Sequence, residues 1–240
     1  MKGAAIYSFI ITCEHGGNRI PAPYDSLFRD EQALLDSHRG YDPGALLMAQ
    51  ELAVAFDAPL VTATVSRLLV DLNRSIAHPQ LFSAATRHLP PTLREEILAQ
   101  YYRPYREQVE RLVKQAVSDG QRVIHISSHS FTPELNGKVR RADVGLLYHP
   151  ARHDEVKLCS HWKAALAELA PALRVRRNYP YAGKGDGLTA YLRLRFASAT
   201  YIGIELEVNQ RIVLAQAAQW TALRALLLDS LRTACVISIA

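Results

Sequence analysis

The sequence contains few cysteines and no long hydrophobic run. Only three cysteines occur among 240 residues, and Cys13, Cys159 and Cys235 are widely separated. This spacing excludes a disulfide framework and a cysteine-based zinc knuckle. No apolar stretch reaches the roughly 20 residues that a bilayer-spanning helix needs. The sequence also lacks internal repeats and low-complexity segments. These absences predict an ordinary globular protein with no membrane partner.

The excess of positive charge is small. The chain has 28 Lys and Arg against 23 Asp and Glu, which gives a formal net charge of +5. The arginines are scattered, and few of them alternate with aromatic residues as they do in nucleic-acid-binding segments. We therefore expect no nucleic-acid partner. The positive charge is interpreted as a solvated surface with a pocket for a small anionic substrate.

The first 17 residues, MKGAAIYSFIITCEHGG, share some features with a signal peptide, because one lysine precedes an apolar run. That run is short, however, and charged residues follow where a cleavage site of small residues should lie. We interpret residues 5–13 as a buried first strand and expect a cytoplasmic protein.

Predicted strands and helices alternate along the chain. Apolar runs and period-two patterns predict strands at residues 5–13, 58–65, 122–130, 143–150, 173–180 and 200–210. Apolar residues at three- and four-residue spacing predict helices at 42–56, 153–170, 187–196, 217–236 and 90–120, the last with a break at Pro104. Asp42 is the expected N-cap of the first helix, with Pro43 at the first helical position. The alternation predicts one α/β domain over residues 1–240, a three-layer sandwich with a mixed, largely parallel sheet.

Polar residues of chemically reactive types follow several predicted strands. They occur in the stretches CEHGGN, SSHSF, ELEVN and SRLLVDLNRS. Ligands of open α/β sheets bind beyond the carboxyl ends of the strands, so these stretches predict one pocket. Neutral imidazoles delivered by separate strands are typical zinc ligands, which makes His15 and His129 the candidate pair. Because a catalytic zinc keeps three protein ligands, a third is expected among Glu14, His38, Asp42 and Glu205.

The residues after His15 bear on this metal site. Gly16 and Gly17 allow a tight turn, so that the backbone leaves room for the ion and its substrate. Asn18 stands where an H-x-x-E pair would supply a carboxylate, and an amide is a poor zinc ligand. The simplest metal-binding pattern is therefore interrupted at this position.

The last predicted strand carries two carboxylates on one face. With the two-residue period of a strand, Glu205, Glu207 and Asn209 point to the same side. A carboxylate beside metal-activated water is the usual general base of metal-assisted amide hydrolysis. Either glutamate is therefore a candidate for this role.

The stretch DLNR combines a cation with an amide. Arg74 can hold a carboxylate through two parallel hydrogen bonds, and Asn73 can donate to the same group. Arg67 lies seven residues earlier and can polarise a carbonyl. These residues predict a small acidic substrate. The structural alternative for Arg74 is an ion pair with Asp71 or Asp143.

Seven stretches resemble the N-formylglutamate amidohydrolase family, which is distantly similar to zinc carboxypeptidases and aspartoacylases. They are CEHGGNRIP, HRGYDPGA, SRLLVDLNR, HISSHSF, RRADVGLLYHP, NYPYAGKGDGLT and GIELEVNQ, in this order over residues 13–210. The resemblance implies a phosphorylase/hydrolase-like fold. It also implies one zinc ion bound by His15, His129 and Asp42.

The same resemblance implies roles for the remaining candidates. It implies that the substrate is bound by Asn73, Arg74, Tyr181 and Thr189. Glu207 matches the general-base position of the family, with Glu205 as the alternative two residues away. His38 and Glu14 remain alternatives to Asp42 as the third metal ligand.

The function that this resemblance implies is zinc-dependent hydrolysis of the amide bond of a small N-acylated acidic amino acid, such as N-formylglutamate. Glu207 would take a proton from the activated water, and Arg67 would help to stabilise the oxyanion. The same machinery would serve a zinc peptidase or a peptidoglycan amidase. A third hypothesis belongs to another class: a metal-free binding protein for anions or nucleic acid on the same fold.

Overall fold

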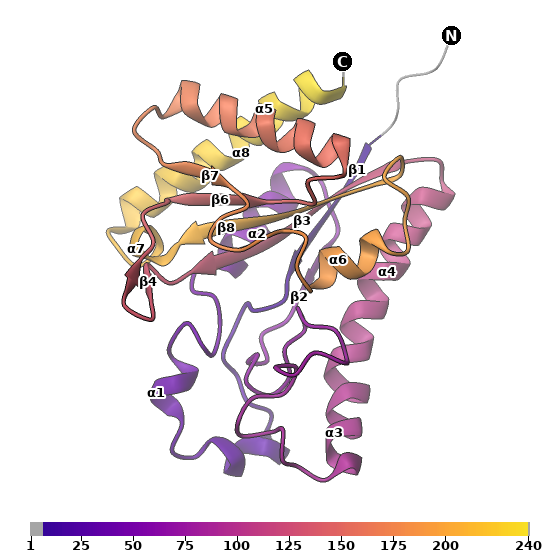
Figure 1. The fold of residues 1–240 in the computed structure, drawn as a ribbon, viewed down its shortest axis with the longest axis vertical. Helices are drawn as coiled ribbons and strands as arrows, with labels where there is room; N and C mark the ends of the chain where they lie inside the picture. Colours follow the sequence, from indigo (N-terminus) through magenta and orange to yellow (C-terminus); the bar gives the residue numbers. More distant parts are fainter. Residues whose placement is uncertain (1–6, 240) are drawn as a thin grey trace.

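A six-stranded sheet forms the centre of the computed structural model, which describes residues 7–239 (Figure 1). In spatial order its strands are β2 Leu60–Thr62, β1 Tyr7–Cys13, β3 Arg122–Phe131, β8 Tyr201–Asn209, β6 Val144–Leu147 and β7 Val175–Arg177. The first four are parallel, whereas β6 runs antiparallel to β8 and parallel to β7. The sheet is mixed and largely parallel, as the sequence predicts. Residues 5 and 6 of the predicted first strand lie outside the described residues.

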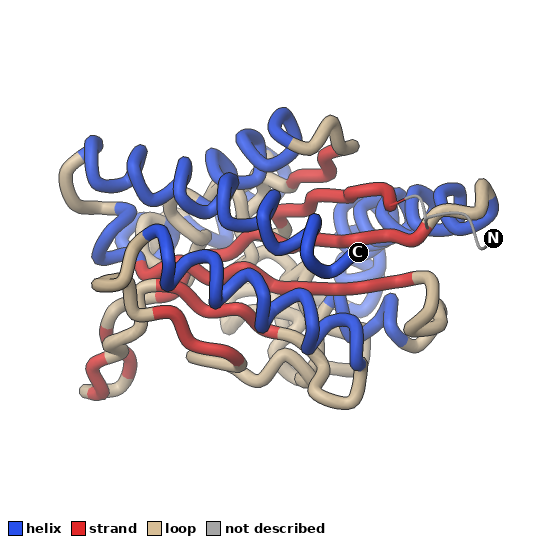
Figure 2. Tube along the Cα trace, turned by 90° about the horizontal axis from the view of Figure 1, so that it is seen from above, coloured by secondary structure: helices blue, strands red, loops and turns tan. Residues whose placement is uncertain are grey.

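Helices cover both faces of this sheet (Figure 2). One face packs against α2 Ala45–Ala55, α5 His153–Leu169 and α8 Ala217–Ile239. The opposite face packs against α4 Arg103–Ser118 and α6 Leu188–Arg193. Neighbouring residues of a strand point to opposite faces, and Ile11 and Ile10 accordingly belong to different hydrophobic clusters. The result is the predicted three-layer α/β sandwich.

Short elements between the main ones complete the fold. They are a 3₁₀ helix at Ala22–Phe28, α1 Gln32–Leu35, α3 Pro91–Ile97, α7 Gln210–Val213, and a hairpin of β4 Glu134–Leu135 and β5 Lys138–Val139. The chain between β1 and α2 and the chain between β2 and α4 lie together, below the sheet in Figure 1. Apart from α3, which lies within the helix predicted at residues 90–120, the sequence analysis did not predict these short elements, because each is too short to show a clear periodicity.

The long helix predicted at residues 90–120 is interrupted near the expected proline. It consists of α3, a π-helical segment at Leu98–Tyr102, and α4 from Arg103. Pro104 has no N–H group, so the carbonyl four residues earlier loses its helical partner. The backbone widens into the π-helical segment in the turn directly before Pro104.

The predicted N-cap at Asp42 is wrong. Helix α2 begins at Ala45, and its N-cap is Gly44 in the left-handed region, with φ of 76°. A Cβ atom at Gly44 would lie 2.4 Å from Val213 Cγ1, so this position requires glycine on both counts. The Asp42 carboxylate is consequently free of the helix and contacts side chains at the end of the sheet.

Within the described residues 7–239, no helix has the length and apolar character to cross a membrane. The strands are shorter than predicted at β2, β6 and β7, because their predicted ranges included the adjoining loops.

Candidate metal centre and active site

A cavity of about 350 Å³ opens beyond the carboxyl ends of β1, β3 and β8. Parallel strands all deliver their carboxyl ends to this edge, so segments far apart in the sequence meet here. Most of the predicted site residues line the cavity: His15, Asp42, Arg67, Asn73, Arg74, His129, Tyr181, Glu205 and Glu207. Asp71 and Asp186 also line it, and the sequence analysis had not assigned either one to the site.

Three segments bring His15, Asp42 and His129 together. His15 follows β1, and its carbonyl accepts a hydrogen bond of 2.9 Å from the Asp42 backbone N–H. His129 projects from β3. A Cβ at Gly17 would lie 2.6 Å from the Thr64 carbonyl oxygen, so the turn after His15 can pass the neighbouring chain this closely only with glycine.

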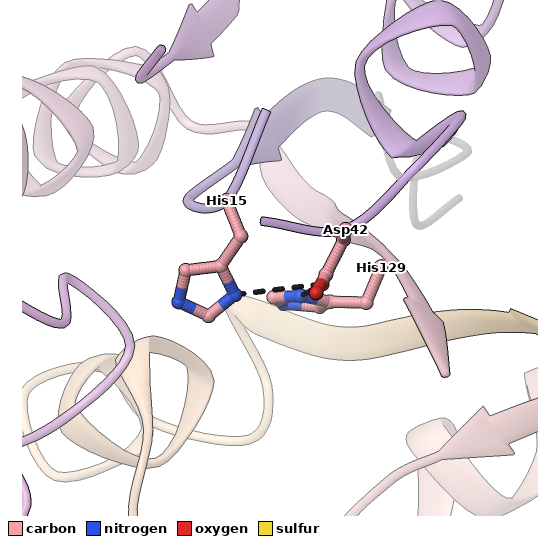
Figure 3. Close-up of side chains that lie close together, drawn as sticks. All are labelled: His15, Asp42 and His129. Carbon is pink, nitrogen blue, oxygen red and sulfur yellow. Dashed lines mark hydrogen bonds and ion pairs between the residues drawn. The ribbon is translucent and has the colours of Figure 1, made fainter. Parts of the chain in front are cut away.

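The donor atoms of these three buried residues form a compact group (Figure 3). One ligand atom from each residue lies within 4.8 Å of the other two. His129 Nδ1 lies 2.9 Å from Asp42 Oδ2, and His15 Nδ1 lies 3.4 Å from the same oxygen. Two imidazole nitrogens and a carboxylate oxygen are a donor set typical of a catalytic zinc. The residues therefore fit a divalent metal ion.

The outer nitrogen of each histidine contacts a carboxylate. His15 Nε2 lies 2.7 Å from Asp71 Oδ1, and His129 Nε2 lies 3.1 Å from Glu14 Oε2. Metal-binding histidines commonly use their second nitrogen in this way, which fixes the ring and raises its basicity. The two rings are therefore oriented with Nδ1 towards the shared donor group.

Glu14 is held under the site by a buried hydrogen-bond network. Its carboxylate accepts hydrogen bonds from Ser127 Oγ at 2.6 Å and from Tyr105 Oη at 3.0 Å. Burial raises the pKa of Glu14, but the contacts with His129 and Ser127 outweigh it and lower the pKa to about 2. Glu14 therefore supports His129 from behind instead of joining the three-residue donor group.

Tyr105→Phe should destabilise the fold by about 1–2 kcal/mol, because it removes a donor from a buried carboxylate. The effect is measurable as a lower free energy of unfolding in urea. Tyr101→Phe is the matched control: Tyr101 is partly exposed, and its hydroxyl makes no hydrogen bond with the described residues. Equal stability of Tyr105→Phe and wild type would contradict the role given to this hydrogen bond.

Arg67 approaches the same donor group. Its Nη2 donates to Asp42 Oδ1 at 2.9 Å and also contacts His15 Nδ1. A guanidinium and a metal ion are both cations and compete for these atoms, so ion binding requires Arg67 to move. The donor group therefore attracts a positive charge, whether that charge belongs to Arg67 or to a metal ion.

The two glutamates of β8 differ in their contacts. Glu205 Oε1 already accepts a hydrogen bond of 2.6 Å from the Thr189 hydroxyl. Glu207 lies directly opposite His129 in the β3–β8 register, and its buried Oε2 has no partner among the described residues. Burial raises the pKa of Glu207 to about 8. Both glutamates line the cavity, but only Glu207 has a buried carboxylate oxygen with no partner among the described residues.

The predicted substrate-binding residues Asn73, Arg74 and Tyr181 line the cavity beside the donor group. Asn73 Oδ1 accepts a hydrogen bond from the Leu188 N–H at 2.6 Å, and Asn73 Nδ2 lies 3.5 Å from His129 Nε2. Arg74 Nε lies 3.9 Å from Asp71 Oδ2, and its side chain is 35% exposed. Tyr181 is exposed at the mouth, where its hydroxyl accepts from Arg140. Thr189 is buried and does not line the cavity.

Other histidines and acids lie apart from the donor group. His38 lines a neighbouring hollow. His125 is buried between the hydroxyls of Thr12 and Tyr201, and burial lowers its pKa to about 4, as expected for a packed histidine. Asp143 pairs with Arg174 and Arg211, not with Arg74.

The sequence analysis missed the role of Asp71 next to His15. Asp71 belongs to the stretch DLNR, and its Oδ1 accepts a hydrogen bond of 2.9 Å from the Asn73 N–H. The sequence analysis treated Asp71 only as a possible ion-pair partner of Arg74. Its contact with His15 spans 56 positions and is not visible in a local pattern.

The fold and the cavity define the class of protein first: an α/β sandwich of the hydrolase type, with its polar site beyond the strand ends. A model of the N-formylglutamate amidohydrolase family matches residues 7–214. The chain belongs to this family, and the resemblance predicted from the sequence is confirmed.

Solved structures are similar over nearly the whole chain. A gene product of Agrobacterium tumefaciens is 29% identical, with a TM-score of 0.83 over 97% of this chain and 92% of that one. N-formylglutamate amidohydrolase from Ralstonia eutropha is 20% identical, with a TM-score of 0.67 over 98% of this chain and 95% of that one, a likeness in fold. A metallo-carboxypeptidase from Burkholderia cenocepacia, 13% identical with a TM-score of 0.39, is too dissimilar to support an argument. The comparison with curated proteins found no match.

Proposed function

We propose that this protein hydrolyses the amide bond of a small N-acylated acidic amino acid, such as N-formylglutamate, with one zinc ion. The observation that carries the proposal is the donor group of His15, Asp42 and His129, whose ligand atoms lie within 4.8 Å of one another. Membership of the amidohydrolase family supports the reaction class. The cavity of about 350 Å³ suits a small molecule better than a peptide chain.

His15, Asp42 and His129 would hold the zinc ion through two nitrogens and one oxygen. When bound, zinc supplies a positive charge that acidifies water and polarises the scissile carbonyl. In the reaction, one water molecule adds to the acyl carbon and the C–N bond breaks. The products of N-formylglutamate are formate and glutamate.

The protein side chains would carry the proton and hold the substrate. Glu207 takes a proton from the attacking water and delivers it to the leaving nitrogen. Arg67, whose Nε has no partner among residues 7–239, donates to the carbonyl oxygen as negative charge develops there. Asn73 and Arg74, which line the same cavity, bind the carboxylate of the amino acid.

The proposal is tested by assaying release of formate from N-formylglutamate by protein as purified, after chelation, and after zinc is restored. We expect activity to be lost on chelation and to return with about one equivalent of zinc per chain. N-formyl derivatives of neutral amino acids serve as comparison substrates. Activity that survives complete removal of metal would contradict the zinc role, and no hydrolysis of any N-acyl amino acid would contradict the function.

Arg74→Ala should raise KM for N-formylglutamate about 10–100-fold with a smaller change in kcat, because it removes a charged hydrogen bond to the substrate carboxylate. Steady-state kinetics measures both constants. Arg111→Ala is the matched control, since Arg111 is exposed on α4 and does not line the cavity. If KM stays unchanged and only stability falls, Arg74 has the structural role suggested by its 3.9 Å approach to Asp71.

A further inference from the structure

A second hollow adjoins the proposed active site. It has a volume of about 310 Å³ and shares Arg67 and Asp71 with the first cavity. Its other walls come from the loops before α2 and after β2 and include His38, Arg39 and Arg87. A molecule bound at the donor group therefore has a second space to enter beside Arg67.

The second hollow is electropositive. Arg39 and Arg87 are exposed, and neither side chain forms an ion pair or hydrogen bond with the residues that the structure describes. The acid in its wall is Asp71, which is already engaged by His15 Nε2 and by the Asn73 N–H. Burial lowers the pKa of His38, and the nearby charge of Arg39 lowers it further. The unpaired charges in this hollow are therefore positive.

The second hollow lies on the side of Arg67 where the acyl end of the substrate is expected. Asn73 and Arg74 line the first cavity but not the second, whereas Arg67 lines both. A substrate with its amino-acid carboxylate at Asn73 and Arg74 has its carbonyl at Arg67. The group attached to that carbonyl, the acyl chain, then points past Arg67 towards Arg39 and Arg87. A formyl group has no chain and would leave the second hollow unfilled.

We propose that the second hollow is an acyl-binding subsite that prefers an acyl chain ending in a negatively charged group, held by Arg39 and Arg87. This inference rests on the proposed function, because it assumes that the scissile carbonyl lies at Arg67. The preferred substrates are then N-acyl amino acids with an anion at each end, whereas the formyl compound lacks the anion on the acyl side and does not fill this subsite.

The test compares two ligands that differ in one carboxylate: N-glutaryl-L-glutamate and N-pentanoyl-L-glutamate. Titration calorimetry with the Glu207→Gln protein measures Kd for each without turnover. We expect the glutaryl compound to bind about tenfold more tightly, because two arginines face its terminal carboxylate. In the Arg39→Gln/Arg87→Gln double variant of the same protein, the ratio of the two Kd values should fall to about one. Arg29→Gln, another exposed arginine in a separate hollow, should leave the ratio at about ten.

Equal Kd values for the two compounds would overturn the inference, as would a preference that survives the double substitution or the absence of any binding. These results are separable from failure of the proposed function, which is tested by release of formate from N-formylglutamate by wild-type protein. A protein that releases formate but shows equal Kd values retains its function and lacks the subsite. A tenfold preference that requires Arg39 and Arg87 supports the subsite.

Discussion

Glu207→Gln should lower kcat/KM for N-formylglutamate by about 10²–10⁴-fold, the range for removal of a general base. Glutamine keeps the shape of the side chain but cannot accept a proton from water. Glu207 is buried opposite His129, with one carboxylate oxygen unpaired among the described residues. Burial holds its pKa at about 8, and a cation at the neighbouring donor group favours the ionised form that a base requires. The measurement is the rate of formate release at saturating and limiting substrate.

Glu205→Gln provides the control for this prediction. Its carboxylate accepts the Thr189 hydroxyl at 2.6 Å, and a glutamine oxygen can accept the same bond. We expect a loss of less than about tenfold, consistent with a supporting contact. Both variants should bind as much zinc as wild type, because neither glutamate belongs to the donor group. A larger loss in Glu205→Gln than in Glu207→Gln would contradict the proposal and indicate that Glu205 is the general base.

His129→Ala should abolish stoichiometric zinc binding and reduce activity by about 10³-fold or more, since a catalytic zinc site keeps only three protein ligands. His129 Nδ1 lies 2.9 Å from Asp42 and opposite His15 in the donor group. Removing this imidazole takes away one donor atom and one contact each of Asp42 and Glu14. Asp42 keeps its contact with Arg67, and Glu14 keeps those with Ser127 and Tyr105. Zinc content is measured by elemental analysis after dialysis, on protein shown to be folded by circular dichroism.

Two further variants serve as comparisons for His129→Ala and distinguish loss of a metal ligand from loss of the fold. His153→Ala, at a side chain 89% exposed, should leave zinc content and activity at wild-type values. Glu14→Gln should weaken zinc affinity by about 10–100-fold, because it removes the carboxylate behind His129 and not a ligand. Competition with a chromophoric chelator measures this affinity without any assay of activity. Full zinc occupancy in folded His129→Ala protein would refute the proposed ligand set.

The fold was largely predictable because its signals are local. The buried strands β1, β3 and β8 are apolar runs or alternations, and the helices α4, α5 and α8 have three- and four-residue spacing. Pro104 also indicated the irregularity before α4 from its chemistry alone. The spatial order of the strands and the antiparallel direction of β6 were not predictable, because pairing depends on contacts between segments distant in the chain.

Asp42 shows how a local signal misleads. Aspartate before Pro-Gly has the pattern of a helix N-cap, and capping satisfies a backbone donor within one turn. In the fold, Gly44 begins the helix and the Asp42 carboxylate contacts His129, a residue 87 positions away. In this position the Asp42 carboxylate is buried and is stabilised by its contact with His129. The residues next to Asp42 in the sequence do not provide this contact.

The sequence by itself determined an α/β fold and the two histidines at the ends of its parallel strands, because hydrophobic period and strand polarity are properties of short segments. The family was indicated separately, by the resemblance of seven short stretches. Only the tertiary structure decided that Asp42 faces the histidines, that Glu207 and not Glu205 has a buried oxygen without a partner among the described residues, and that Asp71 and Glu14 lie behind the two rings. Each of these depends on side chains from different segments meeting at one edge of the sheet. Such contacts follow from packing of the whole chain and leave no periodic trace in the sequence.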